Sequence, residues 1–263
     1  MIKRKPAREI MLKSAREIEL MRDAGKIAAQ ARNIAGKMVT VGTTTRSINK
    51  AVHDFIKSQG AVPSFLGYRD YPASICISIN EEVIHGIPTS RKLNQGDIVS
   101  IDIGATKNGY IGDCSATFIA GKGNGESEKL VKVTRECFYE GLKNAKAGNR
   151  VSDISKAIQQ YAQANGFSVV RDYTGHGIGT KMHEPPEVPN FYETPRKGPD
   201  PRLIPGMTLA VEPMVNAGGA KIKVLSDGWT VVTADGSNSA HYENTILITE
   251  GEPEILTVCE EMP

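Results

Sequence analysis

Two segments of this chain have the same pattern: Gly42 to Gly60 (GTTTRSINKAVHDFIKSQG) and Gly148 to Gly166 (GNRVSDISKAIQQYAQANG). This repeat is the strongest indication of the fold. The copies are offset by 106 residues throughout, with glycine against glycine at both ends. Apolar residues recur at matching helical positions: Ile48, Ala51, Val52 and Phe55 in the first copy, Ile154, Ala157, Ile158 and Tyr161 in the second. Each copy predicts an amphipathic helix stopped by a glycine, with Thr44 or Thr45 and Ser152 as N-caps.

The elements around the repeated helix are repeated too. A longer helix is expected before each copy, at about 14–36 and about 127–147. After each copy, a short apolar strand leads from a glycine to an acid six residues later, at 96–102 and at 206–212. Matching helix, helix, strand and acid in the same order is much less expected by chance than matching one helix.

This order predicts two α+β halves, roughly 14–120 and 126–250, related by pseudo-twofold symmetry and sharing one sheet. The acids that end the two strands, Asp102 and Glu212, are expected to converge where the halves meet, which is a usual place for a functional site.

Five potential metal ligands stand at strand, hairpin or strand-end positions of this pattern. They are Asp102, Asp113, His176, Glu212 and Glu243. Four carboxylates and one imidazole form an oxygen-rich set, which favours a pair of divalent first-row ions over a sulfur-bound structural zinc. Two such ions carry enough positive charge to keep four buried carboxylates ionised together.

A hairpin places two of these acids together. Asn108-Gly109 is a strong two-residue turn signal, and with that turn Asp113 falls opposite Gly104. Asp102 then lies two residues along on the same face, and the missing side chain of Gly104 is expected to leave room for an ion. A turn longer by one residue would put one acid on the other face, and two solvated acids at a hairpin end remain the alternative.

His176 lies between glycines in the segment 175–179, which allows close backbone approach to a ligand. His183 follows seven residues later in the same Gly- and Pro-rich stretch. This pairing favours a functional role for the two histidines over ordinary core or surface positions. His85, before Gly86, is by itself merely a loop histidine.

Composition narrows the classes of protein to which this chain can belong. The 32 basic and 30 acidic residues nearly balance, which argues against a dedicated nucleic-acid binder. The cysteines lack C-x-x-C spacing and indicate reduced thiols in a cytoplasmic protein; they are Cys76, Cys114, Cys137 and Cys259. No apolar run of signal-peptide or membrane-spanning length is present.

The chain is expected to consist of a short basic extension, residues 1–12, and a single catalytic domain, residues 13–263. The extension is interpreted as a solvated tail, with transient ribosome contact as the alternative.

The motifs resemble those of one known family, the type I methionine aminopeptidases of bacteria and organelles, from about residue 13 to 255. They are Ile75–Asn80 with His85-Gly86-Ile87-Pro88, Ser100–Gly104, Gly112-Asp113, Gly175–Gly179 with His183-Glu184, Val211-Glu212-Pro213 and Tyr242–Thr245. The resemblance implies the duplicated pita-bread fold: two pseudo-twofold halves sharing a curved, mostly antiparallel sheet, with helices outside. It also implies removal of N-terminal methionine, with a preference for a small second residue.

The same resemblance implies two divalent metal ions, of Co, Mn, Fe, Ni or Zn. Asp113 and Glu243 would bridge them, Asp102 would hold one, and His176 and Glu212 would hold the other. A water activated by both ions would attack the first peptide bond.

Catalytic roles are also implied. Glu212 would take the proton of the water, His183 would hydrogen-bond the scissile carbonyl, and His85 would contact the scissile amide. The methionine side chain would be bound by an apolar set, for which core packing is the alternative reading: Phe65, Tyr68, Tyr71, Cys76, Met182 and Trp229. The implied partners are nascent polypeptide N-termini, with no membrane, and a monomer is the expected state.

Three residues depart from the family pattern. Phe65 and Met182 stand where many relatives carry Cys and Phe, and His241 stands where relatives often carry Gln. Two alternatives remain: a proline-specific aminopeptidase or prolidase of the same fold, whose relatives carry a large N-terminal domain, and a non-enzymatic binding module, which would have lost ligands.

Overall fold

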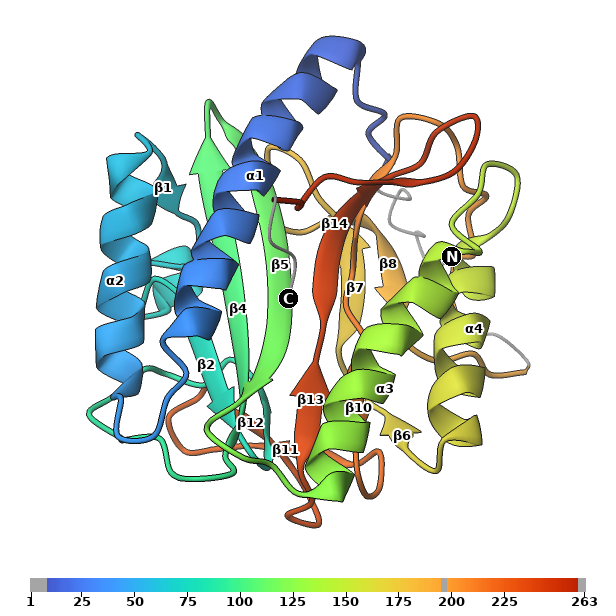
Figure 1. The fold of residues 1–263 in the computed structure, drawn as a ribbon. Helices are drawn as coiled ribbons and strands as arrows, with labels where there is room; N and C mark the ends of the chain where they lie inside the picture. Colours follow the sequence, from blue (N-terminus) through green and yellow to red (C-terminus); the bar gives the residue numbers. More distant parts are fainter. Residues whose placement is uncertain (1–8, 195–197, 260–263) are drawn as a thin grey trace, which may run out of the picture.

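The computed structural model describes residues 9–194 and 198–259 (Figure 1). Most of the basic extension, and with it the proposed ribosome contact, lies outside these residues. In chain order the elements are α1 (Ala15–Lys37), α2 (Thr45–Ser58), β1 (Val62–Pro63), the 3-10 turn η1 (Tyr68–Asp70), β2 (Cys76–Ile79), β3 (Glu82–Ile84), β4 (Ile98–Lys107), β5 (Tyr110–Ile119), α3 (Gly125–Leu142), α4 (Val151–Ala164), β6 (Ser168–Val169), β7 (Thr174–Gly177), β8 (Glu184–Pro189), β9 (Thr208–Val211), β10 (Met214–Asn216), β11 (Ile222–Val224), β12 (Val231–Thr233), β13 (Ser239–His241), β14 (Glu243–Leu247) and β15 (Glu254–Ile255).

One antiparallel sheet joins the two halves of the chain. Its strand order is β1-β4-β5-β14-β9-β7-β8, with β2 beside β4 and β15 beside β14. The seam between the halves is the pair β5–β14, because β4 and β5 come from the first half and β9 and β14 from the second. Helices α1 and α2 cover the first half and α3 and α4 the second, on one face (Figure 1). The predicted α+β pita-bread class is confirmed.

Each half has an apolar core beneath its helices. Ile48 and Val52 of α2 are fully buried in one cluster, and their repeat counterparts Ile154 and Ile158 of α4 are fully buried in another. The helices therefore form because their apolar stripes cover the sheet.

The helix ends confirm most of the repeat and correct two details. Gly60 and Gly166 have positive φ just beyond α2 and α4, as a glycine after a helix requires, and Thr44 caps α2. Ser152 is not the N-cap of α4, since Arg150 takes that place. Asp200 accepts from the Ser152 backbone N–H (3.0 Å), so a distant loop supplies the cap that we expected locally. Helix α3 begins at Gly125 and ends at Leu142, earlier at both ends than expected.

The hairpin has the predicted turn and register. Asn108 and Gly109 both have positive φ, and Gly104 pairs with Asp113. A Cβ on Gly104 would lie 2.8 Å from the ring of Phe65 and 3.1 Å from Cε of Met182. Pocket side chains use the room that the missing side chain leaves. The expected room for an ion between the Asp102 and Asp113 carboxylates stays a prediction.

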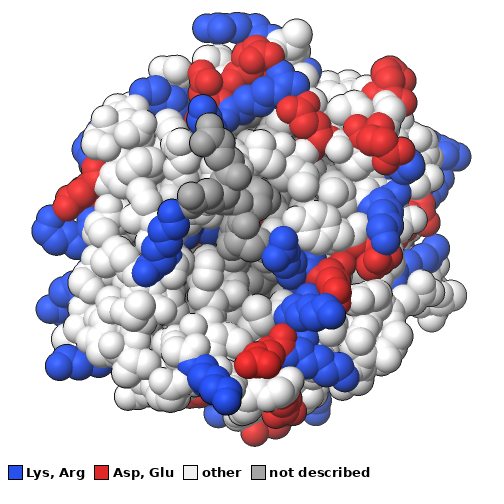
Figure 2. Space-filling view, viewed as in Figure 1, with Lys and Arg blue, Asp and Glu red and all other residues white. Residues whose placement is uncertain are grey.

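The surface carries charges of both signs, as the balanced composition predicts. Lys and Arg are interspersed with Asp and Glu over the helix-covered face (Figure 2). Within 9–194 and 198–259, no helix combines the length and the apolar character needed to cross a bilayer. Within the described residues the four cysteines form no disulfide.

Helix α1 crosses β5 at very close range. A Cβ on Gly112 of β5 would lie 2.5 Å from the backbone Cα of Gly25 in α1, a separation that real Cβ atoms essentially never show. The missing side chain of Gly112 therefore allows the close approach of the helix to the strand that carries Asp113, whereas a Cβ on Gly25 would clash with the carbonyl oxygen of Leu256.

We expect Gly112→Ala to lower the free energy of unfolding by about 1–3 kcal/mol, because the methyl group overpacks a backbone contact. Gly125→Ala is the matched control, since nothing lies within 4 Å of a Cβ there. Chemical denaturation of both variants measures the difference. Equal stability of the two variants would contradict the close helix–strand packing.

Candidate metal centre and adjoining pocket

The five predicted ligands come from five strands that are consecutive in the sheet. Asp102 lies in β4, Asp113 in β5, Glu243 begins β14, Glu212 directly follows β9, and His176 lies in β7. All five line one cavity of about 270 Å³. Residues far apart in the sequence are thus brought together by strand order alone.

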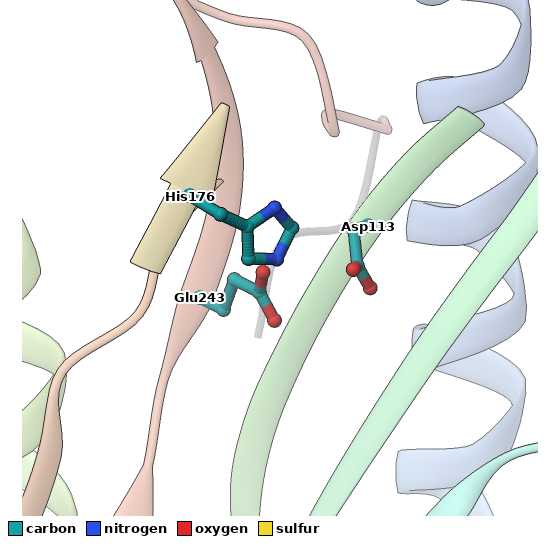
Figure 3. A group of neighbouring side chains, drawn as sticks. All are labelled: Asp113, His176 and Glu243. Atoms are coloured by element: carbon teal, nitrogen blue, oxygen red, sulfur yellow. The ribbon is translucent and has the colours of Figure 1, made fainter. Parts of the chain in front are cut away.

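Three of the five form a tight group. One ligand atom each of Asp113, His176 and Glu243 lies within 4.8 Å of the others, and the three side chains point toward one another (Figure 3). Nε2 of His176 lies 3.6 Å from Oε1 of Glu212, and Asp102 is the diagonal neighbour of Asp113 on the hairpin. The Nδ1–H of His176 donates to the carbonyl oxygen of Gly177 (2.9 Å), which leaves Nε2 free to face the carboxylates.

The electrostatics of the group favour bound cations. Burial raises the pKa of Asp102 to about 7. Burial, with the neighbouring carboxylates adding to it, holds the pKa of Asp113, Glu212 and Glu243 well above the usual range. Burial also lowers the pKa of His176 to about 3, so this imidazole is neutral at neutral pH, as a metal ligand must be.

The residues fit a divalent metal. Among the described residues, Oδ1 of Asp102, Oδ1 of Asp113 and Oε1 of Glu243 are buried without a hydrogen-bond partner. Buried polar atoms are nearly always satisfied, so three carboxylate oxygens without partners in one cavity fit a site for a cation. The oxygen-rich donor set suits divalent first-row ions.

The predicted pocket residues line the same cavity, next to the carboxylates. They are Phe65, Tyr68, Tyr71, Cys76, His85, Met182, His183 and Trp229. The ring of Trp229 packs edge-on against Tyr71, with centroids 5.0 Å apart. The hydroxyl of Tyr71 donates to the carbonyl oxygen of Gly86 (2.9 Å), which satisfies its polar end in an otherwise apolar wall.

His183 is held by its neighbours. Its Nδ1 lies 2.8 Å from the hydroxyl of Tyr68, and its ring stands 4.2 Å from the ring of His176, centroid to centroid. Burial, and then the Arg69 guanidinium, lower the pKa of His183. Burial, and then His183, lower the pKa of His85 to about 4. Both imidazoles are therefore neutral groups at neutral pH.

Sequence reasoning missed part of the cavity wall: Arg69, Ile84, Asp172, Tyr173 and Thr174. Tyr173 and Thr174 directly precede the glycine-flanked His176, so their position was a usable signal. Arg69 has a left-handed backbone (φ 50°), which no local pattern indicates.

Comparison with known proteins agrees with this geometry. The family model of the M24 metallopeptidases matches residues 19–250 of this sequence. A methionine aminopeptidase of Clostridium acetobutylicum is 53% identical over 252 residues, covering 95% of this chain and 100% of the relative. Methionine aminopeptidase 1 of Bacillus subtilis is 51% identical over 248 residues, covering 94% of this chain and 99% of the relative.

Solved structures extend the likeness to the fold. The crystal structure of methionine aminopeptidase from Thermotoga maritima matches with a TM-score of 0.91 at 44% identity, covering 95% of this chain and 99% of that one. A prolidase from Pyrococcus furiosus matches with a TM-score of 0.73 at 23% identity, covering 95% of this chain and 66% of that one, and shares the fold alone. This chain belongs to metallopeptidase family M24.

The raised pKa values predict that metal binding releases protons. Burial raises the pKa of Asp102 to about 7 and holds the pKa of Asp113 well above its usual range, so these carboxyls retain protons in the metal-free protein, and a cation that binds their ionised form displaces them. Metal affinity should therefore fall as pH is lowered from 8 to 6, by about tenfold per pH unit for each proton displaced.

Calorimetric titration of metal-free protein with Mn²⁺, in two buffers of different ionisation enthalpy, measures the protons released. Identical heats in both buffers would show that the carboxyls are already ionised and would contradict the electrostatic account of the site.

Proposed function

We propose that this chain is a methionyl aminopeptidase, which removes the N-terminal methionine of nascent polypeptides and peptides and favours a small second residue. The observation that carries the proposal is the direct opening of a buried five-ligand centre into an aromatic, sulfur-containing pocket. The methionine aminopeptidases that match nearly the whole chain support the same activity.

The metal centre is proposed to hold two divalent ions. Asp102, Asp113, His176, Glu212 and Glu243 would hold them. Such ions, when bound, would lower the pKa of a water molecule and neutralise the surrounding carboxylates. Co, Mn, Fe, Ni and Zn all suit this donor set.

Protons are moved and hydrogen bonds are donated by the protein's own side chains. Glu212 is the proposed general base, which takes a proton from the attacking water and returns it to the departing amine. His183 is proposed to donate from Nε2 to the scissile carbonyl oxygen, which gains negative charge as the bond to water forms. Tyr68 supports this role, because a hydroxyl donating to Nδ1 leaves the ring hydrogen on Nε2. His85 is proposed to contact the scissile amide.

The pocket is proposed to select the first residue. Phe65, Cys76, and Met182 are buried, and Tyr71 and Trp229 form an edge-to-face pair beside them. An unbranched, polarisable thioether packs well against aromatic rings and sulfur. The free α-amine would lie beside the carboxylates, which explains removal of one residue at a time.

Free thiols and nascent-chain substrates agree with action in the cytoplasm, where we place the protein, as a monomer. A proline-specific peptidase of the same fold would have to use the same five ligands, whereas a binding module would have lost some of them, and neither alternative has support beyond the shared fold.

Hydrolysis of Met-Ala-Ser tests the activity, with Leu-Ala-Ser and Ala-Pro-Ser as controls. We expect release of methionine only, lost with a chelator and restored by Mn²⁺ or Co²⁺, because the pocket fits one thioether and the centre needs cations. Release of alanine from Ala-Pro-Ser would favour the proline-specific alternative, and no cleavage of any peptide with any added ion would favour a binding module.

We expect Glu212→Gln to lower kcat by roughly 10²–10⁴-fold, since it removes the base and weakens one ligand together. Glu252→Gln is the control, because Glu252 is an exposed partner of Lys146. Steady-state kinetics with metal content measured on the same samples separates lost base from lost ion. Activity of Glu212→Gln near that of the unaltered protein would refute the proposed mechanism.

A further inference from the structure

His241 faces the metal centre but has no part in the activity described so far. It ends β13, is 2% exposed, and its Nε2 is buried without a hydrogen-bond partner among the described residues. Carboxylate oxygens of two proposed ligands lie close to that nitrogen: Oε2 of Glu212 at 3.9 Å and Oε2 of Glu243 at 4.0 Å. One unsatisfied imidazole nitrogen thus stands between two carboxylates.

The backbone of His241 is held firmly in this place. Its N–H donates to Oγ1 of Thr117 (2.9 Å), and Thr117 Oγ1 donates back to the carbonyl oxygen of His241 (2.8 Å). On the other side, β13 pairs with β10, with His241 opposite Met214. Thr117 lies in β5, the strand that carries Asp113, so the same strand fixes this imidazole and one ligand.

The separations of 3.9 and 4.0 Å are too long for hydrogen bonds, yet a small rotation of either glutamate would close them. An ionised carboxylate near a buried N–H gains a charge-assisted hydrogen bond, which is shorter and stronger than a neutral one. Ligating carboxylates are commonly oriented by such partners. A buried nitrogen without a hydrogen-bond partner does not stabilise the metal-free fold.

We propose that His241 is a positioning residue of the metal centre, which donates its Nε2 hydrogen between Glu212 and Glu243 and holds both carboxylates in their ligating orientation. This inference rests on the proposed metal centre. It predicts that His241 acts on metal affinity rather than on the stability of the metal-free fold.

Two variants at this position test the role. His241→Leu keeps a similar volume but has no donor, whereas His241→Gln keeps an N–H at nearly the same reach. His53→Leu is the matched control, because His53 bonds to Ser74 outside the cavity. Binding of Co²⁺ and of Mn²⁺ to each metal-free protein is measured by calorimetry, together with thermal unfolding.

We expect His241→Leu to lose about 10–100-fold in metal affinity. His241→Gln should retain most of the affinity, His53→Leu all of it, and His241→Leu should unfold in its metal-free form no earlier than the unaltered protein. Unchanged affinity in His241→Leu overturns the proposal, as does an equal loss in His241→Gln, which would mean that the donor is not what matters. Earlier unfolding of metal-free His241→Leu at unchanged affinity would assign a merely structural role.

The result is separable from the proposed activity. Tight metal binding that depends on His241, without cleavage of Met-Ala-Ser, would contradict the proposed aminopeptidase activity and support the positioning role of His241. Cleavage with no effect of His241→Leu on metal affinity would do the reverse.

Discussion

The antiparallel pairing of β5 with β14 is the constraint on which the rest of the structure depends. It joins the two halves with Glu243 opposite Ser115, which sets Glu243 diagonally beside Asp113. Arg32, wholly buried in α1, donates from Nη1 to the carbonyl oxygen of Glu243 (3.1 Å) and to Oδ1 of Asn244 (2.9 Å). A helix of the first half therefore holds a strand of the second, and fixes the backbone of a proposed ligand.

The same seam concentrates charge where water is scarce. Burial raises the pKa of all four carboxyls, and repulsion from neighbouring carboxylates adds to the rise for Asp113, Glu212 and Glu243, so the metal-free site favours protonated forms. Such an arrangement does not stabilise a fold by itself, and perturbed carboxyls gathered in a cleft are typical of functional sites. The close packing of Gly112 in β5 against the backbone of Gly25 in α1 supports the strand that carries Asp113.

Much of this could be predicted because local rules reach a few residues along the chain. The positive φ of Asn108 and Gly109 follows from the turn, and the turn fixes Gly104 opposite Asp113. The cap of α4 could not be predicted in the same way, because Asp200 reaches Ser152 from 48 residues away. The packing of Phe65 and Met182 against Gly104 could not be predicted for the same reason, since both residues come from other segments.

The sequence by itself determined the repeated helices, the hairpin register and the five residue types able to bind cations, since periodicity, turn chemistry and side-chain chemistry are properties of short segments. Only the tertiary structure decided that five consecutive strands would bring these residues to one cavity. It alone turned Tyr68 toward His183 and set His241 between two carboxylates. The contacts of Tyr68 with His183 and of His241 with Glu212 join residues more than 25 positions apart. Their geometry depends on how whole strands pack rather than on any local pattern.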